Sequence, residues 1–134
     1  MSQKNLFFEG SAHVPLLIMP PQGRSLPHNI SVEAPTDLVD IYPTILAMAG
    51  LSSPVSVSGK NLLEPVPMDR MFFGNSLNKN FCVMEEKVKL VYSAVGDHVL
   101  LFDLTTDPME QHNLAEDPAW QERKAKLWKL SLIH

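Results

Sequence analysis

Apolar residues in the first half of the chain form one short run and one helical pattern. The run 14–19 is almost entirely apolar and is followed by two prolines, which predicts a strand buried on both faces. Apolar residues then recur at helical spacing within 38–48. Thr36 or Asp37 can cap this helix and Gly50 can end it. The first half therefore predicts a strand followed by a helix.

The second half has a different pattern. Four short runs are typical of strands: Arg70 to Phe73, Asn80 to Glu85, Lys87 to Ala94 and Val99 to Leu104. Gly96-Asp97 predicts a turn that joins the last two runs as an antiparallel hairpin. Asp117-Pro118 then predicts the start of a helix. One face of this helix carries Trp120, Lys124, Leu127, Trp128 and Leu132. The pattern predicts an α+β fold, with a small antiparallel sheet of about four strands and a C-terminal helix.

Composition narrows the possible functions. The 134 residues are 45% hydrophobic and 19% charged, which is a globular balance. The net charge is −4 and no basic cluster is present, so we expect no nucleic-acid partner. The apolar runs are too short to cross a bilayer, and no signal peptide is visible, so the sequence assigns no compartment. The single cysteine, Cys82, excludes an internal disulfide.

Three parts of the chain, taken in order, are similar to a known family. The first part is KNLFFEGSAHVPLLI (4–18). The second is DLVDIYPTILAMAGL (37–51), followed by GKNLL (59–63). The third is LFDLTTDPMEQHNLA (101–115). Together they resemble the sulfatases of the alkaline-phosphatase-like superfamily, in particular the arylsulfatases and choline-sulfatases.

The resemblance implies a division of the chain. Residues 1–66 would form the C-terminal edge of the α/β catalytic domain, which would be incomplete here, and 67–134 the C-terminal α+β subdomain. In the family the nucleophile is a Cys or Ser in Cys/Ser-x-Pro-Ser-Arg that matures to formylglycine, beside calcium ligands. No such motif occurs here, and Cys82 lacks the neighbouring Pro and Arg. We therefore expect calcium and formylglycine only in an intact enzyme, and no catalysis by this chain alone.

The resemblance also implies two site residues. Lys4 matches a family lysine that contacts the sulfate group, and an ammonium with three donors suits sulfate oxygens. His98 is a candidate for lining the substrate pocket, since the C-terminal sheets of the family border the cleft. His13 stands where the family usually has arginine before Val-Pro.

Other polar residues favour structural roles. No titratable group adjoins Glu9 in the sequence, which favours structural hydrogen bonding over acid–base chemistry. The spacings of the five histidines fit no pair of metal ligands, so we expect no metal site in this chain. A calcium loop is an alternative for the last group of polar residues, but turn formation and capping explain them better. These residues are Asp103, Asp107, Glu110 and Asn113.

Three functions remain open. The first is hydrolysis of a sulfate ester substrate by an intact sulfatase to which this chain belongs. The second is hydrolysis of phosphonate or phosphate esters, because these chemistries share the need for cations around a tetrahedral anion. The third is a non-catalytic binding module. We expect the apolar segment from Phe7 to Met19 to contact either a missing upstream catalytic segment or a second copy of the chain.

Overall fold

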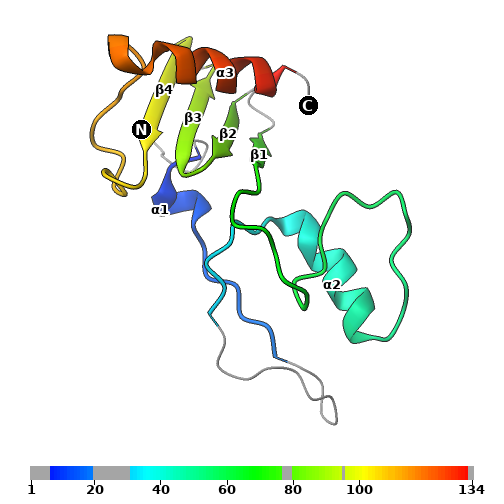
Figure 1. Cartoon of the computed structure of the whole chain (residues 1–134). Coiled ribbons are helices and arrows are strands. Elements are labelled where there is room, and N and C mark those ends of the chain that lie inside the picture. Colours follow the sequence, from blue (N-terminus) through cyan, green and yellow to red (C-terminus); the bar gives the residue numbers. More distant parts are fainter. Residues whose placement is uncertain (1–6, 20–30, 77–79, 95, 133–134) are drawn as a thin grey trace. The chain divides into compact units, whose positions relative to one another are not determined.

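The computed structural model describes residues 7–19, 31–76, 80–94 and 96–132 (Figure 1). The chain forms two compact units, Leu16–Arg70 and a second one made of Met1–Pro15 with Met71–His134. The N-terminal residues up to Pro15 thus group with the second half of the chain. The division into domains 1–66 and 67–134 of a larger protein stays a prediction.

The larger unit is built on a four-stranded sheet in the order β1-β2-β3-β4. Its strands are β1 (Phe72–Asn75), β2 (Phe81–Glu85), β3 (Val88–Ser93) and β4 (His98–Asp103). Every neighbouring pair is antiparallel. The α+β fold predicted from the sequence is confirmed, and each strand lies within two residues of its predicted run.

The hairpin turns depend on left-handed backbone conformations. Gly96 and Asp97, between β3 and β4, both have positive φ, and the turn predicted there is confirmed. Glu86 and Lys87 form a two-residue turn between β2 and β3, also with positive φ. Glycine or asparagine usually marks such a turn, and neither is present, so this turn was not predicted from the sequence.

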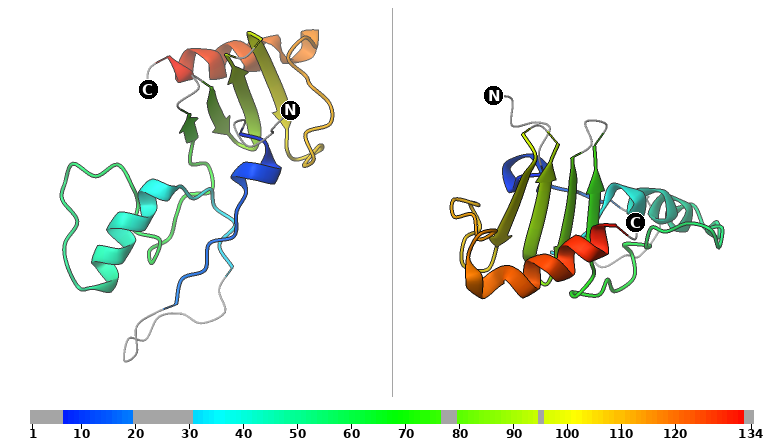
Figure 2. Two further views of the ribbon diagram at one scale, coloured as in Figure 1. Left: turned by 180° about the vertical axis from the view of Figure 1, so that it is seen from behind. Right: turned by 90° about the horizontal axis from the view of Figure 1, so that it is seen from above.

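A C-terminal helix covers one face of the sheet (Figure 2). The Asp117 side chain accepts a hydrogen bond from the Ala119 backbone N–H at the start of η3 (Pro118–Trp120), which leads into α3 (Gln121–Ser131). The core between them consists of Val83, Val88, Leu90, Leu101, Ala115 and Leu127. The Trp128 ring extends this core, with its centroid 5.5 Å from that of Phe81 and 5.6 Å from that of Tyr92. The helix predicted after Asp117-Pro118 is confirmed.

The opposite face of the sheet carries a different set of side chains. Register places Met84, Lys89 and Phe102 side by side in one row, and Cys82 and Val91 in the next. The N-terminal segment lies on this face and includes the short helix α1 (Glu9–Ala12), as the right-hand view of Figure 2 shows. The sequence pattern did not predict α1.

The smaller unit contains α2 (Ile41–Met48), preceded by the 3-10 turn η2 (Leu38–Asp40). Asp37 caps η2 through a capping box with Asp40. Gly50 follows the helix with a φ of 75°. The predicted helix, its cap at Asp37 and its end at Gly50 are confirmed.

The strand predicted at 14–19 is not formed. These residues have no strand partner among the described parts of the chain, and a strand needs a neighbour for its backbone hydrogen bonds. Leu17 and Met19 are 90% and 84% exposed. Within the smaller unit, Leu16–Met19 line an apolar groove together with Ile41 and Ile45 of α2. None of the helices in the described ranges has the length and hydrophobicity needed to span a membrane.

Candidate functional site

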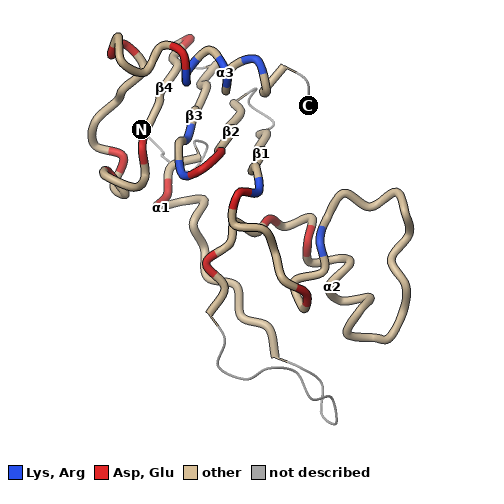
Figure 3. The backbone as a smooth tube through the Cα atoms, in the orientation of Figure 1, with Lys and Arg blue, Asp and Glu red and all other residues tan. Residues whose placement is uncertain are grey.

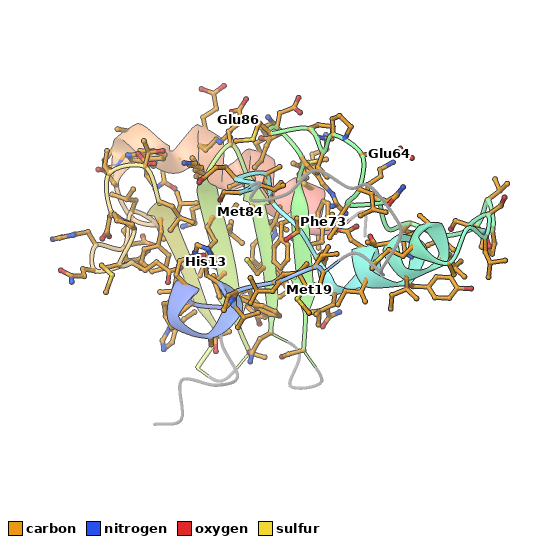
Figure 4. All side chains as sticks on the ribbon, turned by 90° about the horizontal axis from the view of Figure 1, so that it is seen from below. His13, Met19, Glu64, Phe73, Met84 and Glu86 are labelled. Carbon is orange, nitrogen blue, oxygen red and sulfur yellow. The ribbon has the colours of Figure 1, made fainter. Side chains whose placement is uncertain are left out.

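The N-terminal segment is fixed on the sheet by two phenylalanine rings. The Phe8 ring packs on that of Phe102, with a centroid separation of 6.0 Å. The Phe7 ring covers Gly74 so closely that a Cβ placed on this glycine would lie 2.6 Å from a ring carbon. Glycine at this position therefore leaves the space that the ring occupies. The chain then enters α1, seen in front of the strands in Figure 4, with His13 at its end.

A cluster of charged residues lies beneath α1. Lys89 of β3 has a side chain that is only 2% exposed, and its Nζ lies 2.6 Å from Oε1 of Glu9 and 2.9 Å from Oε1 of Glu110. The backbone N–H of Glu9 donates to Oε2 of Glu110 at 2.6 Å. We call Glu9, Lys89 and Glu110 the anchor cluster. Burying an ion costs several kcal/mol unless partners compensate, and here two carboxylates surround one ammonium.

His13 extends this cluster to the surface. Its Nδ1 lies 3.0 Å from Oε2 of Glu9, one helical turn earlier, and its side chain is 80% exposed. Oε1 of Glu110 has the ion pair with Lys89 but no aligned hydrogen bond among the described residues. The ammonium of Lys89 is therefore buried. The carboxylate of Glu9 contacts both this ammonium and the exposed His13 at the end of α1.

Glu110 lies in the loop after β4, and this loop places its side chain in the anchor cluster. Glu110 adopts a left-handed conformation, with a φ of 54°, which costs a residue with a Cβ roughly 1–2 kcal/mol. The loop around it is held by side-chain-to-backbone bonds. Oδ1 of Asp103 accepts from Thr105, Oδ2 of Asp107 accepts from His112, and Oδ1 of Asn113 accepts from both Leu101 and Ala115. The hydrogen bond from the His112 backbone N–H helps to lower the pKa of Asp107.

These bonds confirm the turn and capping interpretation of Asp103, Asp107 and Asn113. The fourth residue of that set, Glu110, differs, because its side chain binds Lys89 and the Glu9 backbone N–H. Within the described ranges, no three His, Cys, Asp or Glu side chains come together in a way that could hold a metal ion. The carboxylates of the anchor cluster face Lys89, which occupies the position that a cation would take. The carboxylates of Glu9 and Glu110 are therefore paired with an ammonium rather than open to a metal ion.

Of the two site residues that the resemblance implies, the structure describes only His98. Lys4 lies outside the described residues, so its contact with sulfate stays a prediction. His98 is the first residue of β4, pairs with Ser93 and is exposed. Its ring packs on Gly96, where an added Cβ would lie 2.7 Å from Nε2. Pocket lining by His98 also stays a prediction.

Cys82 is buried in the sheet. It is 1% exposed, and burial raises the pKa of its thiol to about 12. A thiol with this pKa stays protonated at neutral pH and is a poor nucleophile, because the reactive form is the thiolate.

Within the stretch 37–51, the run DIYPT (40–44) has a structural role in the smaller unit. Asp40 is fully buried, and its carboxylate accepts two hydrogen bonds from the Arg70 guanidinium, at 2.6 and 2.9 Å. It also accepts from the backbone N–H groups of Lys60 and Asp37, at 2.7 and 2.8 Å. The Thr44 hydroxyl donates to the Asp40 carbonyl and accepts from the Leu62 N–H. These bonds fasten the GKNLL segment to α2.

Sequence reasoning found Glu9 as a structural residue but missed its partners. Lys89 lies 80 positions further along the chain and Glu110 101 positions. One signal was available: Lys89 interrupts an otherwise apolar run, Val88 to Val91, in which both faces of the strand are buried. A lysine in such a run needs a buried carboxylate partner.

Relatives named as sulfatases support the resemblance. Arylsulfatase K of Bos taurus is 34% identical over 131 residues, which cover 84% of this chain and 24% of that protein. Choline-sulfatase of Rhizobium meliloti is 38% identical over 124 residues, covering 84% of this chain and 23% of that protein. The chain thus spans about a quarter of the length of these relatives.

Solved structures show the same fold. A Bacteroides thetaiotaomicron protein described as a sulfatase matches with a TM-score of 0.58 and 23% identity, over 68% of this chain and 22% of that one. The phosphonate monoester hydrolase of Agrobacterium radiobacter matches with a TM-score of 0.57 and 25% identity, over 75% of this chain and 25% of that one. The family described as N-sulphoglucosamine sulphohydrolase, C-terminal, matches residues 1–132, and the chain therefore belongs to this sulfatase family.

Proposed function

We propose that this chain serves as the C-terminal part of a sulfuric ester hydrolase. The observation that carries the proposal is the family match over residues 1–132, which includes the run from Lys4 to the Val14-Pro15 pair. In this role the chain completes the fold around a site whose nucleophile and metal ligands come from other residues of the intact protein. In the intact protein, a bound calcium ion would supply charge stabilisation, and a formylglycine matured from a Cys or Ser upstream would supply the nucleophile.

The contribution of this chain to the chemistry is Lys4. Its ammonium donates hydrogen bonds to the sulfate oxygens and offsets the negative charge that builds on the leaving oxygen. The buried Lys89 is not available for this task, because Glu9 and Glu110 both hold it. The sulfate contact therefore falls to a lysine outside the anchor cluster.

The experiment is an assay of an intact protein that carries this chain, with an aryl sulfate as substrate. We expect Lys4→Ala to lower kcat/KM by about 10²–10³, the usual loss when a donor to the developing charge is removed. Lys129→Ala is the matched control, because Lys129 is exposed on α3 and should leave the rate unchanged. Equal rates for the two variants would contradict the role of Lys4. Absence of turnover in the unmutated protein would favour the third function, a non-catalytic binding module.

The likeness to the Agrobacterium radiobacter enzyme gives a second candidate, hydrolysis of phosphonate esters. Both reactions place cations around a tetrahedral anion, so the same lysine suits either substrate. Running an aryl phosphonate beside the aryl sulfate separates them. A higher kcat/KM for the sulfate supports the first candidate, and a higher value for the phosphonate supports the second.

A further inference from the structure

We propose that Glu9, Lys89 and Glu110 are positioning residues, which fix the N-terminal segment on the sheet and through it hold Lys4 at the sulfate group. The inference rests on the proposed function for the role of Lys4. The attachment of the segment itself rests only on the described residues.

The cluster ties three distant parts of the chain together at one point. Lys89 is the second residue of β3, Glu9 is the first residue of α1, and Glu110 lies in the loop after β4. Stability alone does not require charges here, because well-packed apolar side chains often serve a buried site as well as an ion pair does. In this proposal the charged partners serve to fix one geometry of the segment, since each ion must meet its partner in order to be buried.

Glu110 acts on the main chain of the segment. Its Oε2 accepts from the backbone N–H of Glu9, which is the first residue of α1 and has no partner within the helix. The left-handed conformation of Glu110 is unfavourable for a residue with a Cβ. Such a conformation persists where surrounding contacts require it, and here it accompanies a side chain that holds the segment.

The aromatic contacts extend the attachment towards the start of the chain. Phe8 packs on Phe102, and Phe7 fills the space left by Gly74. Phe7 follows Lys4 by three residues, and three residues of extended chain span at most about 11 Å. Fixing Phe7 and Glu9 therefore restricts the volume that Lys4 can reach. A displacement of about 1 Å at a reacting group can cost about a hundredfold in rate.

The attachment can be tested by amide hydrogen exchange on the chain of 134 residues. The reporters are the amides of Ser11, Ala12 and His13, which donate to carbonyls within the segment. We expect Glu9→Gln and Lys89→Met to speed their exchange at least about tenfold, because charge-assisted bonds are lost. Exchange in β2 should stay slow, which shows that the sheet has folded. Lys129→Met is the control. Unchanged exchange in Glu9→Gln, the less buried site, would overturn the proposal.

The positioning role needs the intact protein and a double-mutant cycle with Lys4→Ala. We expect Glu9→Gln and Lys89→Met to lower kcat/KM for an aryl sulfate by about 10- to 100-fold. In the Lys4→Ala background the same changes should cost less than about twofold, because they act through Lys4. Lys89→Arg, which keeps the charge, should recover part of the rate.

The outcomes separate the two proposals. If Lys4→Ala has no effect on kcat/KM, the assigned role of Lys4 fails, and the positioning role fails with it. If Lys4→Ala lowers the rate but Glu9→Gln and Lys89→Met do not, only the positioning role is overturned. Equal losses in both backgrounds would mean that the cluster acts through stability, which also overturns it.

Discussion

Asp40 and Lys89 are both buried charged side chains, 0% and 1% exposed, and each is compensated by partners from other segments. Around Asp40 the partners are the Arg70 guanidinium and two backbone N–H groups. Around Lys89 they are two carboxylates. At both sites the loss of a single partner leaves an uncompensated buried ion, which is far more costly than the loss of an exposed ion pair.

The pH dependence of the smaller unit should follow Asp40. Burial would raise the pKa of this carboxyl, but the hydrogen bonds from Arg70 and from the Lys60 and Asp37 backbones outweigh burial and place the pKa below its usual value. A lowered folded-state pKa means that the ionised group stabilises the fold above the unfolded pKa of about 3.9. This stabilisation is lost as the pH falls through the folded pKa.

We therefore expect Asp40→Asn to destabilise the smaller unit by about 3–5 kcal/mol near neutral pH, with a difference that shrinks in acid. Amide exchange of α2 (Ile41–Met48) at several pH values measures this directly. An equally protected helix in the variant at neutral pH would contradict the assigned role of Asp40.

At the scale of elements, local pattern predicted most of the secondary structure. The four strands, α2 and α3 each carry their own periodicity, caps or turn residues. The run 14–19 misled the prediction, since an apolar run specifies burial but cannot supply a strand partner. Helix α1 was missed because contacts with Phe102 and Glu110, far along the chain, hold its segment in place. The partners of Glu9 were missed for the same reason, because Lys89 and Glu110 are far from it in the sequence.

The junction between α2 and the GKNLL segment should be sensitive to one glycine. A Cβ on Gly59 would collide with the backbone carbonyl of Val39, which cannot move aside as a side chain could. We expect Gly59→Ala to destabilise the smaller unit by about 1–3 kcal/mol. Gly10→Ala is a suitable control, because nothing lies within 4 Å of its added Cβ. Faster exchange of the α2 amides in the first variant but not in the second is the expected result, and equal exchange would contradict it.

At the scale of the whole molecule, the two units differ in how well their apolar side chains are buried. The sheet unit has a closed core between its strands and α3. The smaller unit exposes apolar side chains along Leu16–Met19 and on α2, where Ile45 is 57% exposed. Figure 3 shows acidic and basic positions interspersed among the described residues of the sheet unit. The exposed apolar side chains, rather than charge, should therefore govern how the isolated chain behaves in solution.

We expect the chain alone to self-associate through the exposed residues Leu16–Met19. Phe7 and Phe8, the start of the segment predicted for this contact, pack on the sheet instead. Light scattering over a range of concentrations should show a mass above that of one chain. Replacing Leu17 and Met19, the two most exposed large apolar residues of this stretch, with glutamate should restore the monomer. A monomeric unmutated chain at all concentrations would contradict this expectation.

The most direct test of the central claim is release of sulfate from a chromogenic aryl sulfate by the chain of 134 residues, with calcium present. We predict no turnover above background for the chain or for its Lys4→Ala variant, because the sequence contains no Cys/Ser-x-Pro-Ser-Arg motif and the proposed function assigns the nucleophile and metal ligands to other residues. Turnover that disappears in Lys4→Ala would contradict the account, since this chain would then hold a complete catalytic site of its own.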